Sequence, residues 1–576
     1  MTKYTQYIIA MVLLLGIAFY FFARKNTAGM YSTDEAVILE GQQIYAKNCL
    51  SCHGIQDDGF GPPLGGITSL LSKEELINFI KNPLKAMESG NERAIAMNSR
   101  YKRIMPPFGH LVDADIESIL AYIAHETKLH QIAPLSLRRE NKITGLTGRL
   151  VPPIKKSKLK ITLEEVIALP QLDSTSNLGV VTLRPHPSGD GTLFASDQNG
   201  IIYSIANGKA ITFLDMKEQI KDFQSGPGIA TGLGSFDFHP DFLTNGLLYI
   251  SHAETHKGQL ADYAIASDSL QSEVQWVIAE WKMDDISSNT FNGTHRELLR
   301  LHAPTFAHGL QELAFIPELE KADLDYGLLY FGYGDGGSNN IHQPQLGHHL
   351  QSFLGTIMRI DPAGSNSRNG HYGIPESNPF ANGKDDKIVK EIFAYGFRNP
   401  HHMSWDKASD NRMIATDIGE ANLEELNIIE NGGDYGWPNR EGEYGIATLT
   451  DLKTVFKLKE TDNDLYKNPF AEYDHEEGNA ISGGYVYEGK LTALQNKYIF
   501  GDIVNGRLFY VDIDPQISDT AIYELGIAQN GTEETTLQEL CNTKRLHLRV
   551  AYDHINKELY LITKHDSKIW RVTSAN

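Results

Sequence analysis

The chain has 576 residues, enough for more than one domain, and 41% of them are hydrophobic, as in a globular protein. Its 52 Lys and Arg residues against 73 Asp and Glu give a net charge of −21 at pH 7. This acidity disfavours nucleic acid as a partner, because a negative surface is repelled by phosphate. With only 3 cysteines, the sequence also lacks the second cysteine pair that many structural zinc sites need.

An apolar run occupies residues 7–23 and is followed by Arg24 and Lys25. Its length is at the short limit for a membrane span and also fits the core of a signal peptide. The small residues 27–29 are the nearby cleavage candidate, but they lie behind the two charges. We therefore expect residues 1–31 to be an N-terminal anchor rather than a removed signal peptide.

A c-type haem attachment motif, CLSCH, follows at residues 49–53. Cys49 and Cys52 can each add through sulfur to a haem vinyl group, and His53 is placed to ligate the iron. The alternatives are a chance match or half of a zinc site. Because bacteria attach c-type haem outside the cytoplasmic membrane, we expect the body of the chain on the periplasmic side.

The second iron ligand is expected at Met105, in the segment IMPPFG of residues 104–109. The two prolines exclude a helix, so the loop can place a thioether beside the haem. Met87 and Met97 are the competing candidates. An amphipathic helix is predicted over residues 113–123, and residues 32–129 as a whole resemble a class I cytochrome c domain.

The pattern changes after a proline-rich and basic connector, which we place at residues 130–159. Residues 160–576 read as short strands separated by turns, with strand-turn-strand hairpins predicted around Asn199-Gly200 and Asn505-Gly506. So many short strands with few long helices predict an all-β propeller, which protects its sheet edges by radial repetition. The number of blades cannot be read from the periodicity.

Five motifs in this region resemble, in order, those of the glucose/sorbosone dehydrogenase family. They are HGLQEL at 308–313, GDGG at 334–337, LGTIMRID at 354–361, YGFRNP at 395–400 and NGGDYGWP at 431–438. The resemblance covers roughly residues 160–576. It implies a six-bladed propeller that binds pyrroloquinoline quinone (PQQ) and calcium and oxidises the anomeric carbon of aldoses to lactones.

The chemistry of these residues is consistent with that activity. Oxidation of a hemiacetal needs a base, and a neutral imidazole suits the task, so His308 is the candidate. Asp335 could accept the other ring N–H and orient the base. Arg398 and Asn399 provide a cation and an amide suited to a reduced quinone, and the resemblance implies that this pair contacts PQQ.

Residues 417–427 gather carboxylates in a loop, a setting that calcium prefers. The resemblance implies that the backbone carbonyls of Gly419 and Glu420 bind the calcium beside PQQ. It also implies a second, structural calcium at Glu425 and the backbone of Tyr435. A solvated acidic loop is the alternative.

The sequence departs from the family pattern at two places that matter for PQQ. The family pattern places a lysine after the strand at 498–502, but this chain has Val504 and Asn505 at the corresponding positions. The late Arg-x-Arg clamp has a stretched counterpart at residues 544–549, in which Arg545 is the candidate PQQ ligand. The carboxylates of PQQ are therefore expected to be held more weakly or by other groups.

A reduced quinone must be reoxidised one electron at a time, and a tethered haem can do this. The sequence thus predicts an exported aldose dehydrogenase whose cytochrome passes electrons to an acceptor of the respiratory chain. Two alternatives remain open. A calcium-dependent propeller lactonase or hydrolase would need no haem, whereas a non-catalytic glycan-binding propeller is favoured by the missing lysine.

Overall fold

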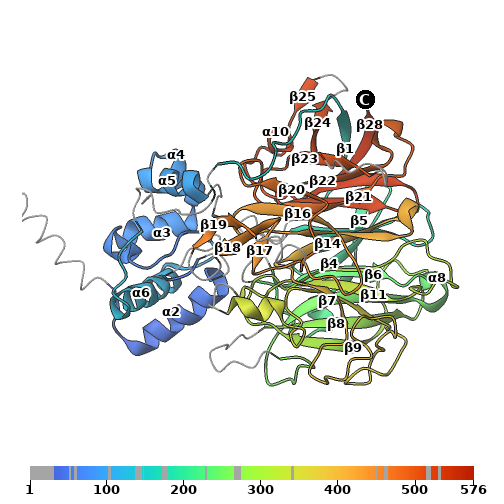
Figure 1. The fold of residues 1–576 in the computed structure, drawn as a ribbon, viewed down its shortest axis with the longest axis horizontal. Helices are drawn as coiled ribbons and strands as arrows, with labels where there is room; N and C mark the ends of the chain where they lie inside the picture. Colours follow the sequence, from blue (N-terminus) through green and yellow to red (C-terminus); the bar gives the residue numbers. More distant parts are fainter. Residues whose placement is uncertain are drawn as a thin grey trace, which may run out of the picture. The chain divides into compact units, whose positions relative to one another are not determined.

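The computed structural model describes residues 31–576 apart from short gaps at 51–52, 57–60, 102–104, 136–145, 147, 171–178, 227–229, 265–273, 339–342, 448–450, 459–464, 514–520 and 530–532. The chain divides into two compact units, and the boundary falls at residues 139 and 140, inside the predicted connector. The smaller unit is helical and the larger is built of strands (Figure 1).

The helical unit has five α-helices among its described residues. They are α2 (Glu35–Asn48), α3 (Lys73–Lys81), α4 (Pro83–Glu88), α5 (Glu92–Tyr101) and α6 (Asp113–Leu129), with the 3₁₀ turn η2 (Ile67–Ser69). Helix α6 confirms the predicted helix at 113–123, and it packs on α2. A Cβ on Gly41 of α2 would lie 1.9 Å from the carbonyl oxygen of Ser118, so this crossing requires glycine.

No helix among the described residues is long and apolar enough to cross a membrane. The predicted anchor at residues 7–23 lies outside the described residues, so this finding does not bear on it.

The larger unit contains four separate four-stranded sheets. The first has β2 (Val180–Pro185), β3 (Leu193–Asp197), β4 (Ile201–Ala206) and β5 (Lys209–Asp215), and the second has β6 (Leu233–Phe238), β7 (Leu247–Thr255), β8 (Val274–Met283) and β9 (Gly293–His302). The third has β10 (Leu310–Phe315), β11 (Leu329–Tyr333), β12 (Thr356–Ile360) and β13 (Ile392–Tyr395), and the fourth has β14 (Pro400–Asp406), β15 (Arg412–Asp417), β16 (Leu423–Ile428) and β20 (Ala471–Asp474).

A further, nine-stranded sheet consists of two groups. The first group has β21 (Ile481–Val486), β22 (Lys497–Asp502), β23 (Leu508–Asp512) and β24 (Tyr523–Gln529), to which β25 (Glu533–Thr535) is added. The second has β26 (Leu548–Asp553), β27 (Glu558–Thr563), β28 (Lys568–Ala575) and β1 (Lys160–Ala168). A short parallel pairing between β1 and β24 joins the two groups.

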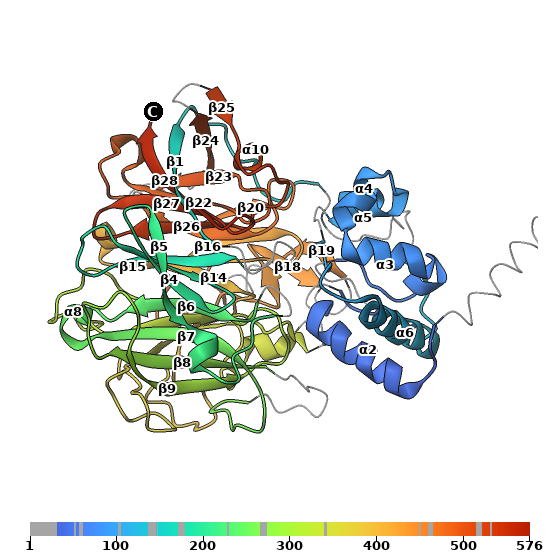
Figure 2. The ribbon, with the colours of Figure 1, turned by 180° about the vertical axis from the view of Figure 1, so that it is seen from behind.

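The first strand of each group lies innermost, and these strands form a closed ring. Contacts run from β2 to β6, β10, β14, β21 and β26, and β26 contacts β2 again. The last group is completed by β1, which comes from the start of the unit and pairs antiparallel with β28 near the C-terminus. Figure 2 shows β1 beside β28 from the opposite side. Ring closure therefore depends on strands from both ends of the unit.

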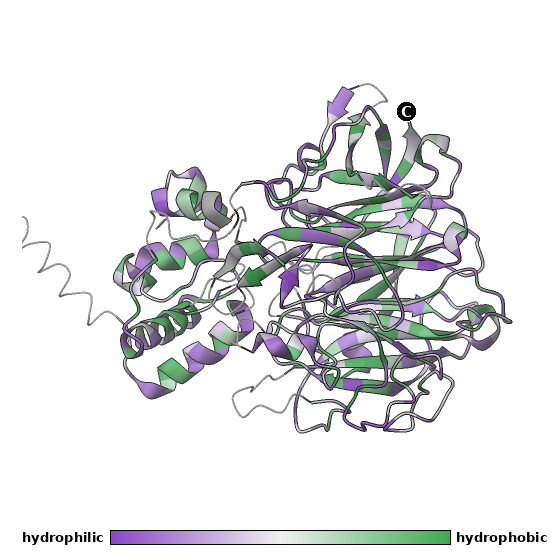
Figure 3. Ribbon diagram, viewed as in Figure 1, coloured by the Kyte–Doolittle hydropathy of each residue, from purple (hydrophilic) through white to green (hydrophobic). Residues whose placement is uncertain are grey.

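The remaining elements of this unit are short. They are β17 (Arg440–Glu441), β18 (Tyr444–Ala447) and β19 (Asp451–Lys457), the helices α7 (Met216–Gln219), α8 (Phe242–Asn245) and α10 (Leu537–Leu540), and the 3₁₀ turns η4 (Pro344–His348), η5 (Lys407–Ser409) and η6 (Thr492–Leu494). Apolar residues concentrate in the strands and polar residues in the loops (Figure 3). Burial of these apolar faces between neighbouring sheets is the main term that stabilises the unit.

The end of the predicted connector is bonded to the β unit. The backbone N–H of Leu146 donates to Val455 at 2.8 Å, and Lys155 exchanges backbone hydrogen bonds with Ile522 and Glu524. These contacts fix the residues that lead into β1.

Candidate functional site

His308 and Asp335 form a hydrogen-bonded pair at one end of the third sheet. His308 lies two residues before β10 and has a positive φ of 47°, which is uncommon for a residue with a side chain and is often found at functional sites. Its Nδ1 is 2.6 Å from Oδ1 of Asp335, which follows β11. The histidine side chain is 15% exposed and that of the aspartate 1%. Nδ1 is therefore engaged, and Nε2 is the ring nitrogen left to act as a base.

The carboxylate of Asp335 is held by two further groups. Its Oδ1 accepts from the N–H of Gly337 at 2.8 Å, and its Oδ2 accepts from the indole Nε1 of Trp437 at 3.2 Å. Burial acts to raise the pKa of Asp335, but His308 and Arg398 outweigh it and the pKa is lowered. The carboxylate is therefore ionised and fixed in one orientation, as an orienting partner must be.

Arg398 and Asn399 lie next to this pair, at the entry to β14. The N–H of Asp335 donates to the carbonyl of Arg398 at 2.7 Å. A Cβ on Gly334 would lie 2.6 Å from Cβ of His308 and 3.0 Å from Oδ1 of Asn399, so the three residues meet at a point where only glycine leaves room. The structure thus brings together the residues predicted for catalysis and quinone contact.

The guanidinium of Arg398 is fixed by the loop that follows β15. Its Nε donates to Oε2 of Glu420 at 2.7 Å, and Nη1 donates to the carbonyl of Ile418 at 3.0 Å. Asp417 accepts the backbone N–H groups of Arg398 and Asn399 at 2.9 and 2.6 Å. The acidic loop therefore positions the arginine, in addition to its predicted role with calcium.

The predicted calcium ligands are close together in sequence, but some of their oxygen atoms already accept hydrogen bonds from the protein. Gly419 lies in a tight turn, where a Cβ would be 1.7 Å from the carbonyl oxygen of Leu423. Glu425 accepts from Asn427 at 3.0 Å, and the carbonyl of Tyr435 accepts from Nε of Arg440 at 3.2 Å. Among the residues that the structure describes, no group of three or more His, Cys, Asp or Glu side chains could hold a metal. Both calcium sites stay predictions.

A buried cavity runs along the axis of the ring and is lined by the six inner strands. At one end, Arg184 contacts Glu312, and Oε2 of Glu312 is 3.0 Å from Nδ1 of His402. Burial acts to raise the pKa of Glu312, but the charges of Arg184 and His402 outweigh it and the pKa is lowered. This network was not predicted, because its members come from three sheets and only the closed ring brings them together.

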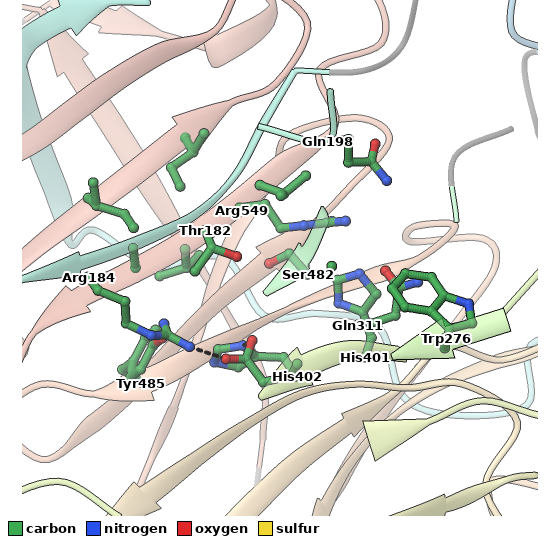
Figure 4. A pocket seen from close by; sticks show the side chains of 17 residues that line it. Thr182, Arg184, Gln198, Trp276, Gln311, His401, His402, Ser482, Tyr485 and Arg549 are labelled. Carbon is green, nitrogen blue, oxygen red and sulfur yellow. Dashed lines mark hydrogen bonds and ion pairs between the residues drawn. The ribbon is translucent and has the colours of Figure 1, made fainter. Parts of the chain in front are cut away.

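Towards the other end, Gln198, Trp276, His401 and Arg549 line the same cavity (Figure 4). Trp276 also lies against Gly309, the residue after His308, where a Cβ would be 2.2 Å from its Nε1. Nδ1 of His401 and Oδ1 of Asn399 have no hydrogen-bond partner among the described residues. Buried polar atoms of this kind are rare, and they indicate a site for a polar ligand.

The positive charge at this end of the cavity suits a ligand with several carboxylates. Arg549 is within the cavity wall, and burial lowers its pKa to about 10. Arg545 lies nearby but donates through Nε to His547 at 3.0 Å, so its predicted role as a PQQ ligand stays a prediction. PQQ, a tricarboxylate quinone, fits this donor set.

In the helical unit, His53 is prepared for an axial bond. Its Nδ1 is 2.8 Å from the carbonyl oxygen of Pro62, which leaves Nε2 for the iron. Gly61 lies against the ring, where a Cβ would be 2.4 Å from Cε1 of His53. Met105 lies in a non-helical, half-buried stretch, as predicted. Cys49 directly follows α2, and Cys52 lies outside the described residues.

The fold and the site together define a class of protein. The protein has a β unit with a closed ring of inner strands and a His-Asp pair, with a cavity lined in part by arginines. A helical unit that carries a CxxCH motif precedes it. Two family models match the chain, "Glucose / Sorbosone dehydrogenase" over residues 184–566 and "Cytochrome c" over residues 38–126. The chain belongs to the glucose/sorbosone dehydrogenase family and carries a cytochrome c domain at its N-terminal side.

Individual relatives match the chain over about half of its length or more. The HIPL1 protein of Arabidopsis thaliana is 27% identical over 58% of this chain and 52% of its own length, so the chain spans about half of that relative. Quinoprotein glucose dehydrogenase B of Acinetobacter calcoaceticus is 24% identical over 50% of this chain and 66% of its own. A solved structure of a glucose dehydrogenase matches with a TM-score of 0.50 and 17% identity, covering 72% of this chain and 99% of that one, which supports the fold alone.

Proposed function

We propose that the protein is a PQQ- and calcium-dependent aldose dehydrogenase that oxidises the anomeric carbon of a sugar to a lactone and passes the electrons to its own haem. The observation that carries the proposal is the fixed pair of His308 and Asp335, whose Nδ1 and Oδ1 atoms are 2.6 Å apart, beside Arg398 and a cavity lined in part by arginines. The family and the resemblance to a quinoprotein glucose dehydrogenase support the same chemistry. We further propose that the β unit is a six-bladed propeller, since six groups of four strands surround the ring.

In this proposal, Nε2 of His308 accepts the proton of the anomeric hydroxyl while the hydrogen on that carbon leaves as hydride. Asp335 keeps the ring in the required tautomer and stabilises the imidazolium that forms. When bound, PQQ supplies a quinone that accepts two electrons. Arg398 and Asn399 provide a cation and an amide for the negative charge that develops on its oxygens.

We assign calcium to the carbonyls of Gly419 and Glu420. Support comes from the tight turn at Gly419 and from the oxygen-rich loop around it, because calcium takes carbonyl and carboxylate oxygens in flexible geometry. The second calcium, at Glu425 and Tyr435, has weaker support, because Arg440 already donates to the Tyr435 carbonyl.

The cytochrome unit supplies the one-electron acceptor. His53 and Met105 are proposed as axial ligands of a haem that is covalently bound through Cys49 and Cys52. We also propose that the chain acts on the periplasmic side of the bacterial membrane, anchored by residues 7–23, and delivers electrons to a respiratory acceptor. The haem attachment motif supports an exported location.

Haem absorbance tests the central proposal. The air-oxidised full chain, loaded with calcium and PQQ, is mixed with a panel of aldoses, and reduction of the haem is followed in the visible spectrum. We expect at least one aldose to reduce the haem only when PQQ is present. His308→Ala should abolish this reduction, whereas His371→Ala, which changes an exposed side chain, should not. Reduction that is independent of PQQ, or that survives His308→Ala, would contradict the proposal.

A non-catalytic binding protein is the second candidate. The chain has no lysine at residues 504 and 505, and this favours a binding protein. Without that positive charge the carboxylates of the quinone would be held less tightly, so the cofactor could have been lost. The retained His308, Asp335 and Arg398 argue for catalysis. Titration of the protein with PQQ separates the two, since only the dehydrogenase is expected to bind the quinone.

A further inference from the structure

The segment from Arg545 to Arg549 leads into β26 and lies between two turns. On one side, the N–H groups of Leu546 and Leu548 donate to the carbonyls of Val504 and Ile503, at 3.2 and 3.0 Å, in the turn between β22 and β23. This is the turn where the family pattern places a lysine and where the chain has Val504, a buried apolar residue. The charge expected on this side of the segment is therefore missing.

On the other side lies the turn between β27 and β28, and it carries Lys564. The N–H of His565 donates to the carbonyl of Leu546 at 3.2 Å, and that of Lys564 lies 3.4 Å from the carbonyl of His547. Two backbone contacts thus fix this turn against the same segment. A lysine absent from one neighbouring turn is present in the other.

The ammonium of Lys564 bonds to a residue of the cavity wall. Lys564 is 4% exposed, and its Nζ donates to Oε1 of Gln198. Gln198 and Arg549 border the same space in Figure 4. Among the described residues, neither Lys564 nor Arg549 forms an ion pair with a carboxylate; Arg549 has one long contact, from Nη1 to the carbonyl of Leu548 at 3.4 Å. The buried amino group of Lys564 and the half-buried guanidinium of Arg549 thus have no carboxylate partner among the described residues, and an anionic ligand would provide one.

The pKa values of the surrounding groups also show that several positive charges lie near this part of the cavity. Burial lowers the pKa of Lys564 well below its usual value, and the charges of Arg549 and Arg545 lower it further, while Asp197 opposes them. The pKa of His401 is lowered in the same way by burial and then by Arg549, His402, Lys564 and His308. Lys564, Arg549 and His401 therefore lie close enough for their charges to act on one another. The unpaired Nδ1 of His401, a residue only 6% exposed, points to a ligand in this space.

We propose that Lys564, together with Arg549, binds the carboxylate groups of PQQ and takes the place of the lysine that family members carry in the turn at 504–505. The inference rests on the proposed function, because it names the groups that hold its cofactor. It also explains how a quinone site can persist without a cation at Val504 or Asn505.

The test measures PQQ affinity, by quenching of tryptophan fluorescence on the calcium-loaded full chain, so that it does not depend on activity. A hydrogen bond to a charged group is typically worth enough to change affinity about 10- to 100-fold, so Lys564→Met should raise the Kd by that factor. Lys209→Met, which removes an exposed lysine on β5, is the matched control and should leave the Kd unchanged. If the Met variant fails to fold, Lys564→Gln removes the charge while keeping a polar side chain.

Two further binding experiments test whether the loss of PQQ affinity is due to the loss of the positive charge at this position. The trimethyl ester of PQQ lacks the carboxylates, so the wild type should bind it at least tenfold more weakly than PQQ, and Lys564→Met should discriminate less between the two. Adding Asn505→Lys to Lys564→Met should restore affinity, because it returns a cation to the family position.

The outcomes separate the two proposals. If the wild type binds PQQ and a folded Lys564 variant binds it equally well, the assignment of Lys564 is overturned and the proposed function stands. If the wild type itself does not bind PQQ, both are overturned.

Discussion

The role of Asp335 is the most direct consequence of the site geometry, and Asp335→Asn tests it with the smallest change of shape. The carboxylate accepts three donors: His308 and the N–H of Gly337 on Oδ1, at 2.6 and 2.8 Å, and Trp437 on Oδ2, at 3.2 Å. An amide has only one acceptor oxygen. We expect that oxygen to take the place of Oδ1, which serves two donors, so that the NH₂ group faces the indole N–H.

Two losses follow from this orientation. The bond to His308 changes from a charge-assisted to a neutral one, and the negative charge that would stabilise the imidazolium is gone. A charge-assisted bond contributes about 1.5 to 3 kcal/mol, so the rate of sugar oxidation should fall by about 10- to 100-fold. If the amide turned the other way, the ring would be held in the wrong tautomer and the loss would approach about 10⁴-fold, the value known for such a change in serine proteases.

The assay is steady-state sugar oxidation with an artificial electron acceptor, together with PQQ titration. We expect kcat to fall while PQQ affinity stays near that of the wild type, because the aspartate touches the base and not the cationic end of the cavity. Asp386→Asn, on an exposed loop, is the control for the substitution itself. An Asp335→Asn variant with wild-type kcat would refute the assignment of Asp335 as the orienting partner.

Three other perturbations address the stability of the chain and the haem. Met105→Ala should convert the haem to a high-spin spectrum and lower its reduction potential, and an unchanged spectrum would exclude Met105 as the ligand. His554→Gln should protect the β unit from acid: burial lowers the pKa of His554 to about 4, so the unfolded state takes up a proton first as pH falls from 6.5 towards 4. At pH 5 the native histidine should cost about 1 to 2 kcal/mol of unfolding free energy that is absent at pH 8, measurable by urea denaturation of both proteins. Leu299→Ala, at a fully buried position, should lower the unfolding free energy by about 2 to 5 kcal/mol, and a loss below 1 would mean that the site collapses around the smaller side chain.

Local signals predicted local structure well. The Asn-Gly pairs at residues 199–200 and 505–506 lie between β3 and β4 and between β22 and β23, as expected from the turn chemistry of these residues. The apolar periodicity after residue 112 predicted α6, whose acidic first turn is present in the structure. The His308-Asp335 pair was also predicted, because each residue lies in a motif with a fixed place in the family.

Contacts between distant parts of the chain could not be predicted. Nothing in the local sequence indicates that Arg184, Glu312 and His402 meet on the axis, because they lie in strands of three different sheets. Lys564 was overlooked for the same reason: it follows β27 in a turn that carries no motif, and only the backbone contacts with residues 546 and 547 place it beside the cavity. Arg440 was missed as the donor to the Tyr435 carbonyl because the intervening turn brings it back towards the chain.

The pairing of β1 with β28 also sets an order of events during synthesis. Strand β1 leaves the ribosome at the start of the β unit, yet its partner β28 spans Lys568–Ala575, about 400 residues later. The β unit therefore cannot close until β28 has been synthesised, and one edge of β1 stays unpaired until then. The haem-binding unit precedes β1 and shares no strand with the ring, so it can fold and receive its haem while the rest of the chain is still open. Premature termination that removes β28 should leave a functional cytochrome attached to an unclosed, aggregation-prone β unit.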